Sequence, residues 1–186
     1  MDRQTVIDAT RRWITSIVIG LNLCPFAERV FLAGKIRYVV TESSDEKALL
    51  LDLAGELQTL VHSPLSSIET TFLIHPSVLG TFADYNDFLG AADQLLRELG
   101  LRGTIQLASF HPEYQFAGTD SRAVENYTNR SPYPMLHLLR EQRNSEVAHD
   151  PSVLQGIPRR NIETLRDLGR DRVLELLKAI EVGRKL

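Results

Sequence analysis

The fold is decided by the stretch Glu69-Thr70-Thr71-Phe72-Leu73-Ile74-His75-Pro76. Its β-branched and aromatic residues predict a strand over Glu69–Ile74, which the His-Pro pair ends. Alternating apolar residues predict a second strand over Lys35–Thr41, and a third is predicted over Thr104–Phe110. The rest of the chain is arranged around these three strands.

Helical patterns separate the strands. A capping box of Ser43 and Glu46 predicts the start of a helix with apolar residues at helical spacing from Leu50 to Val61. A second apolar stripe runs from Tyr85 to Leu99, and Gly100 ends it. Strands joined by helices are parallel. The predicted fold class is therefore α/β, with a small three-stranded, mainly parallel sheet built as β-α-β-α-β.

Further elements lie on both sides of this unit. Helices are predicted over Thr5–Leu21, Asn161–Leu168 and Val173–Val182, and the polar segment Arg143–Gly156 is predicted to be irregular. We expect residues 1–186 to form a single domain. A ferredoxin-like α+β fold is the alternative, if a short strand lies in Ser77–Thr81 or in the long connection Glu113–Thr128.

The stretch Asn126–Glu141 is rich in side chains that recognise ligands. Ser131 suits a helix N-cap and Pro132 the first helical position, so a helix is predicted from here. Its apolar face would carry Met135, Leu138 and Leu139, and its other face Tyr133, His137, Arg140 and Glu141. A helix start preceded by Asn129 and Arg130 would bind a small anion.

Two histidines follow predicted strands. His75 and His111 would both lie at the carboxyl edge of a parallel sheet, where open α/β sheets bind ligands. The candidate catalytic residues are these two imidazoles together with Cys24 and His137, and Asn129 is a candidate for orienting a base beside a Cys24 nucleophile. The candidate substrate-binding residues are Tyr114, Gln115, Asn126, Asn129, Arg130, Tyr133, Arg140 and Arg160. A metal site is the alternative, with His75, His111, His137 and Glu141 as ligands.

Composition limits the function classes. The formal net charge of −3 gives no electrostatic footprint for nucleic acid. The apolar run Trp13–Cys24 is too short to span a bilayer, so no membrane partner is expected. A single cysteine excludes an intrachain disulfide and fits a reducing, cytoplasmic location. The chain has no dinucleotide fingerprint and no Walker phosphate loop, so no nucleotide cofactor is indicated and the cofactor is unknown. The oligomeric state is also unknown.

These features favour an enzyme, a hydrolase or group transferase, that acts on a small anionic metabolite. An imidazole would serve as acid or base, because its unperturbed pKa lies near neutrality. One alternative is a metal-dependent hydrolase that uses His75, His111 and His137. The other is a non-catalytic small-ligand sensor or partner-binding module with the same pocket.

Several of these motifs resemble a family of bacterial proteins, the domain of unknown function 1415. The resemblance is carried by Asn22–Ala27, Asp84–Phe88, Ser109–Gly118, Asn126–Glu141 and Asn161–Leu165. It covers nearly the whole chain and implies a bacterial protein of one domain. It implies no activity, cofactor or catalytic residue.

Overall fold

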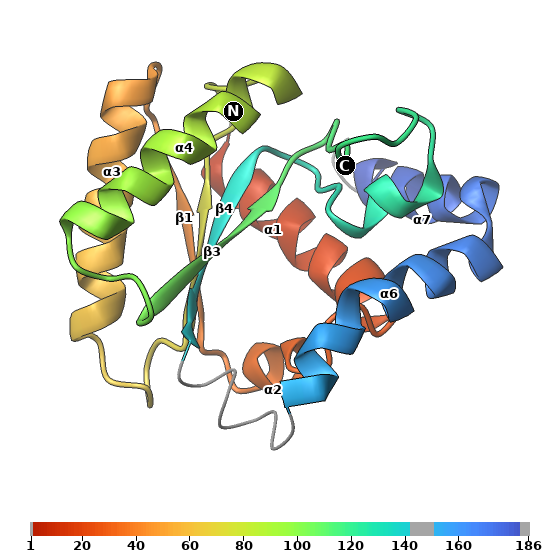
Figure 1. Cartoon of the computed structure of the whole chain (residues 1–186), viewed down its shortest axis with the longest axis horizontal. Coiled ribbons are helices and arrows are strands. Elements are labelled where there is room, and N and C mark those ends of the chain that lie inside the picture. The colour runs from red at the N-terminus through yellow and green to blue at the C-terminus, as the bar shows by residue number, and fades with distance from the viewer. Residues whose placement is uncertain (1, 142–150, 183–186) are drawn as a thin grey trace.

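A mixed four-stranded sheet lies at the centre of the protein (Figure 1). The computed structural model describes residues 2–141 and 151–182. The strands are β1 (Ile36–Val40), β2 (Thr70–Ile74), β3 (Ile105–Phe110) and β4 (Met135–Arg140), in the order β1-β2-β4-β3. β1 and β2 are parallel, whereas β4 is antiparallel to both β2 and β3. The predicted α/β class is confirmed, but the three-stranded, mainly parallel sheet is not.

β4 replaces the helix predicted from Ser131, so that prediction is wrong. Ser131 caps no helix, and its hydroxyl donates to the carbonyl of Tyr133 at 2.7 Å. β4 is a central strand with apolar residues on both faces, and such a strand lacks the two-residue alternation that marks an exposed sheet. The spacing of Met135, Leu138 and Leu139 is therefore the same as that of the apolar face of a helix. The predicted helix start with its anion-binding N–H groups does not exist.

Helices cover both faces of the sheet (Figure 1). On one face lie α3 (Glu46–His62) and α4 (Phe82–Glu98). On the other lie α1 (Arg3–Trp13), the π-helical turn η1 (Ile14–Ile19), α2 (Ala27–Leu32), α6 (Pro151–Leu168) and α7 (Arg170–Val182). A short 3-10 turn, η2 (Val124–Thr128), interrupts the long connection between β3 and β4. Among these described helices, none combines the length and the apolar character needed to cross a membrane.

The face toward α3 and α4 is sealed by fully buried apolar side chains. Leu73 of β2 and Leu136 and Leu138 of β4 have no exposed surface and pack in one cluster with the inward residues of the two helices. Even-numbered β2 residues and odd-numbered β4 residues, such as Phe72 and Met135, point to the opposite face. Adjacent residues of one strand therefore enter two different environments.

Local signals account for most element boundaries. Gly100 follows α4 with a φ of 66°, as predicted for a C′ glycine. The predicted capping box is wrong, because Asp45 caps α3 at the amide of Ala48 while the Ser43 hydroxyl donates to Asp52. Gly20 follows η1 in a position that admits no side chain, since a Cβ there would lie 2.4 Å from the Ser16 carbonyl oxygen.

The ends of the chain also differ from prediction. The predicted helix Thr5–Leu21 divides into α1 and the π turn η1. Residues 143–150 of the predicted irregular segment lie outside the described part of the chain, and the prediction is wrong for residues 151–156, because α6 begins at Pro151. The predicted helix Asn161–Leu168 is thus the second half of α6, and the last helix is α7 as expected.

Candidate functional site

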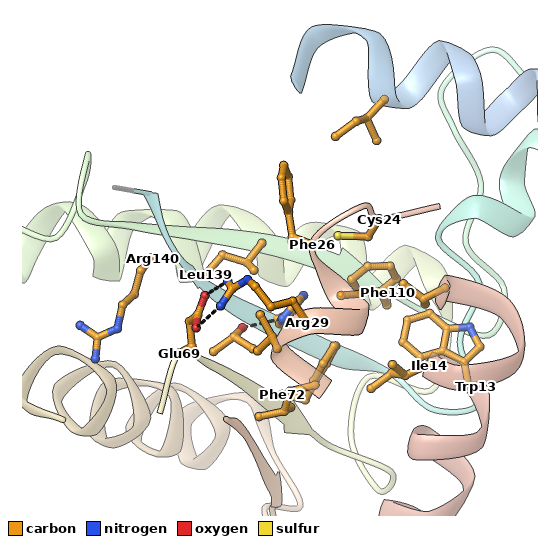
Figure 2. A pocket seen from close by; sticks show the side chains of 18 residues that line it. Trp13, Ile14, Cys24, Phe26, Arg29, Glu69, Phe72, Phe110, Leu139 and Arg140 are labelled. Carbon is orange, nitrogen blue, oxygen red and sulfur yellow. Dashed lines mark hydrogen bonds and ion pairs between the residues drawn. The ribbon is translucent and has the colours of Figure 1, made fainter. Parts of the chain in front are cut away.

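A cavity of about 250 Å³ lies between the sheet and the N-terminal helices, and we call it the sheet cavity (Figure 2). The strands, with the residue before β2, contribute Ile36, Glu69, Thr70, Phe72, Ala108, Phe110, His137, Leu139 and Arg140. The helices and the loop before α2 contribute Trp13, Ile14, Val18, Cys24, Phe26, Ala27, Arg29, Val30 and Ile157. Most of these side chains are apolar, so the cavity suits a ligand with little charge.

His137 is the imidazole of the sheet cavity. Its Nε2 lies 2.6 Å from the hydroxyl of Thr70, which in turn lies 2.7 Å from the carbonyl oxygen of Leu138. The single hydroxyl proton of Thr70 goes to that carbonyl, because a carbonyl only accepts. The Nε2–H of His137 therefore donates to Thr70, and Nδ1 carries the lone pair.

The second nitrogen of His137 has no partner within the described residues. Burial lowers the pKa of His137 from 6.5 to about 3, so the ring is neutral at neutral pH. An imidazole with such a low pKa is a weak base. It is well suited to accept a hydrogen bond, and poorly suited to the acid–base role predicted for it.

The charged side chains at one end of the sheet cavity bind other groups of the protein. Glu69 is almost fully buried and accepts from both terminal nitrogens of Arg29, one of them at 3.1 Å (Figure 2). The guanidinium of Arg140 donates to the carbonyl oxygens of Leu60 and Ser63 at the end of α3. Cations at a helix C-terminus stabilise the helix. Both pocket arginines thus have partners before any ligand arrives.

Cys24 lines the sheet cavity beside Phe26 (Figure 2). Burial raises the pKa of its thiol, against smaller opposite effects of the backbone N–H groups of Phe26 and Ala27 and of the charge on Arg160. The loop before α2 is held by α6, where Arg160 donates to the Asn22 carbonyl and Asn161 to the Leu23 carbonyl, both at 2.8 Å. The thiol is protonated at neutral pH and opens onto the same cavity as His137.

The other two candidate histidines lie outside the sheet cavity. His75 and His111 are fully buried at the strand ends, and both rings contact the ring of Tyr85, at 5.7 and 5.1 Å between centroids. His75 donates from Nδ1 to the carbonyl of Val78, and His111 from Nε2 to that of Leu79. Leu79 has a φ of 58°, which is unfavourable for leucine. The two imidazoles hold this strained turn.

Burial lowers the pKa of His75 to about 4 and also lowers the pKa of His111. Both are therefore neutral donors at neutral pH. The sequence placed them correctly at one edge of the sheet, although β4 separates β2 from β3. His137 does not join them, since it lies on the other face of the sheet.

The candidate substrate-binding residues of the long connection bond mainly to that connection. Gln115 donates to the Thr119 carbonyl, and buried Asn126 bonds to Asp120, Phe116 and Thr119. Asn129 donates to Ser109, and Arg130 donates to Tyr114 and Ser121 while stacking on Tyr127. Tyr114 contacts Phe82, and Tyr133 is buried in the core. None of these six lines the sheet cavity; of the eight candidates, only Arg140 does.

The structure offers no support for the alternative prediction of a metal site. Among the residues that the structure describes, no three His, Cys, Asp or Glu side chains lie close enough together to hold a metal ion. His137 and Glu141 were expected to share a helical face, but a span of four residues in an extended strand is about 13 Å. Both therefore cannot bind one ion at the roughly 2 Å of a metal–ligand bond.

Sequence reasoning missed most of the cavity wall. Trp13, Phe72, Ala108 and Phe110 belong to regular elements and have the residue types of an ordinary core. They border a space only because of where the fold places them, opposite η1, α2 and the loop before α2. The π turn η1 carries Ile14 and Val18 of the wall, and π-helical turns are frequent at functional sites. A π turn has no sequence signature by which it could have been predicted.

Comparison with known proteins identifies a family. A family model described as protein of unknown function (DUF1415) matches residues 5–175. No curated protein and no solved structure matches the chain.

Proposed function

We propose that this chain, which belongs to the family of proteins of unknown function DUF1415, binds a small, neutral and mainly apolar molecule in the sheet cavity. The observation that carries the proposal is an apolar space of about 250 Å³ between two packed layers. Protein interiors are otherwise close-packed. An apolar cavity of about 150 Å³ is enough to bind benzene, so this one would hold a substituted ring or a branched chain.

The chemistry of the polar wall supports binding rather than acid–base catalysis. His137 is neutral and too weak a base to take a proton efficiently near pH 7. Arg29 is paired with Glu69, and Arg140 with the end of α3, which disfavours the anionic ligand expected from the sequence. Nδ1 of His137 would accept a hydrogen bond from a hydroxyl or N–H group on a substituent of the ligand.

The test is calorimetric titration of the full chain with phenol, cyclohexanol and indole. At least one probe should bind, and Ala27→Leu should weaken its binding at least tenfold, because Ala27 lines the sheet cavity and the larger side chain occupies part of it. Ala33→Leu is the matched control, since Ala33 ends the same helix and is exposed. The proposal fails if no probe binds, or if Ala27→Leu and Ala33→Leu have the same affinity as the unaltered protein.

A second candidate is group transfer through Cys24. The observation that favours it is that the only thiol of the chain and the His137 imidazole open onto one cavity. Measurement of iodoacetamide alkylation rates against pH would give the thiol pKa. A value below the free-cysteine value of about 8.5 would support a nucleophile. The raised pKa that burial produces leads us to expect the opposite result.

A further inference from the structure

A ladder of stacked rings crosses the sheet on the cavity side. Tyr38 of β1 lies opposite Phe72 of β2, and Phe72 lies opposite His137 of β4. The Tyr38 and Phe72 rings are stacked at 6.1 Å and 12°, and the Phe72 and His137 rings at 3.8 Å and 10°. Three neighbouring strands thus present parallel rings in register.

The ladder stops at the fourth strand. The residue of β3 opposite His137 is Ala108, which has no ring to continue the stack. Ala108 and His137 both line the sheet cavity, so the space beside the imidazole on the β3 side belongs to it. Phe110, two residues further along β3, borders this space with its ring 6.3 Å from that of His137. Its position would give an edge or tilted contact to anything stacked there.

We propose that the sheet cavity selects a ligand with a planar, neutral aromatic ring, and that this ring lies over Ala108 as the fourth member of the ladder. This inference rests on the proposed function and adds the class of ligand to it. The space matches a ring because its wall on the β4 side is the flat face of an imidazole. Aromatic rings prefer offset-stacked partners on one side and edge contacts on another, and His137 and Phe110 provide both.

The remaining surroundings exclude other ligand classes. A cationic ring would approach Arg29 and Arg140, and an anionic one would have to displace Glu69 from Arg29. A saturated ring of equal size would fill the volume but lose the stacking contact, which for an aromatic pair corresponds to about a 2- to 10-fold difference in affinity. Aromatic selectivity is therefore the property that distinguishes this inference from simple apolar binding.

The experiment compares phenol with cyclohexanol, which carry the same hydroxyl on an aromatic and a saturated ring. The unaltered protein should bind phenol about 2- to 10-fold more tightly in calorimetric titration. That preference should persist in His137→Phe, which keeps a ring in the ladder, and disappear in His137→Leu. Ala108→Phe supplies the fourth ring from the chain itself and should weaken phenol binding at least tenfold. Gln106→Phe is its control, because Gln106 is exposed on the same strand and does not line the sheet cavity.

A measurement on the unaltered protein covers the case in which Ala108→Phe fails to fold. A ring stacked on His137 above Ala108 shifts the Ala108 methyl proton resonance upfield, and cyclohexanol leaves it near its unbound position. Equal affinities for phenol and cyclohexanol in both His137 variants and in the unaltered protein would overturn the aromatic assignment and leave the proposed function standing. Absence of binding by phenol, cyclohexanol and indole alike would overturn the two together.

Discussion

The two faces of the sheet differ in how they are closed. Toward α3 and α4, Leu73, Leu136 and Leu138 have no exposed surface, and the hollow on this face lies at its edge, between α4 and β3. Toward α1, η1 and α2, the same strands border a cavity of about 250 Å³. The sealed face supports the fold, whereas the open face contains the space that the proposed ligand would occupy. Under the proposed function, one face of the sheet would stabilise the fold and the other would bind the ligand.

The histidines show the same division. On the sealed face, His75 and His111 donate to backbone carbonyls that fix the turn at Leu79. On the open face, His137 donates to Thr70 and keeps its second nitrogen without a partner in the described part of the chain. Burial lowers the pKa in all three cases, so a lowered pKa alone does not identify the functional imidazole. His137 differs from the other two in lining the sheet cavity, and the proposed function rests on that position.

The largest difference is expected between two neighbours on β4. Leu138→Ala should lower the free energy of unfolding by about 2–5 kcal/mol, because it leaves a hole among fully buried apolar side chains. Leu139→Ala should cost less than about 2 kcal/mol, since Leu139 is half-buried and already borders the cavity. Urea unfolding followed by circular dichroism measures both. Equal losses would mean that the open face is packed as tightly as the sealed one.

Acid should lower the free energy of unfolding through a histidine on each face, His75 on the sealed face and His137 on the open face. Folded His75 and His137 have pKa values of about 4 and about 3, below the 6.5 of an unfolded chain. Above pH 6.5 these groups are neutral in both states and do not affect stability. Below pH 6.5 the unfolded chain takes up protons that the folded chain does not, so stability falls by about 1.4 kcal/mol per pH unit for each histidine.

His137→Gln removes one of these groups. Between pH 6 and pH 4.5 its unfolding free energy should decline less steeply than that of the unaltered protein, by about 1.4 kcal/mol per pH unit. Urea titrations at half-unit steps measure the slope. Between pH 7 and pH 8 the two proteins should show the same dependence on pH, which is the internal control. Identical slopes in acid would show that His137 is already protonated in the folded protein.

The smallest contrast concerns two adjacent threonines of β2. Thr70→Val on the open face should cost about 1–2 kcal/mol, because Leu138 and His137 lose their partner. Thr71 lies on the sealed face, and its buried hydroxyl has no partner among the described residues. Thr71→Val should therefore be neutral or slightly stabilising. Thermal unfolding measures the pair, and a loss in Thr71→Val as large as that in Thr70→Val would contradict the assignment of the two hydroxyl groups.

The sequence predicted β1, β2 and β3, and failed at β4. β1, β2 and β3 were found because β-branched residues are bounded there by turns and by helical stripes. β4 is apolar on both faces, as β2 is, but its sequence Met135-Leu136-His137-Leu138-Leu139-Arg140 contains no β-branched residue, and Ser131-Pro132 resembles a helix start. The error also altered the predicted site, since a helix would have turned His137 and Arg140 to one side.

The sequence indicated which residue types could form a site, but it did not show which of them lie together. Cys24, His137 and Arg140 do line one cavity. Most of the remaining candidates are polar residues in a long loop, and their side chains form hydrogen bonds within that loop. Asn126, for example, donates to the Asp120 carbonyl, and Arg130 donates to the Tyr114 carbonyl. Sequence alone does not distinguish a polar side chain that organises a loop from one that reads a ligand. Ala108, the residue that leaves the space, carries no chemical signal at all.

The chain contains a single tryptophan, and its place in the cavity wall gives the protein a built-in optical probe. Trp13 donates its indole N–H to the Arg130 carbonyl at 2.9 Å, and its ring meets Phe72 and Phe110 edge-on. Its emission therefore comes from one known location and is free of background from other indoles. Stopped-flow fluorescence could follow the filling of the cavity in real time, without a label and without altering a residue.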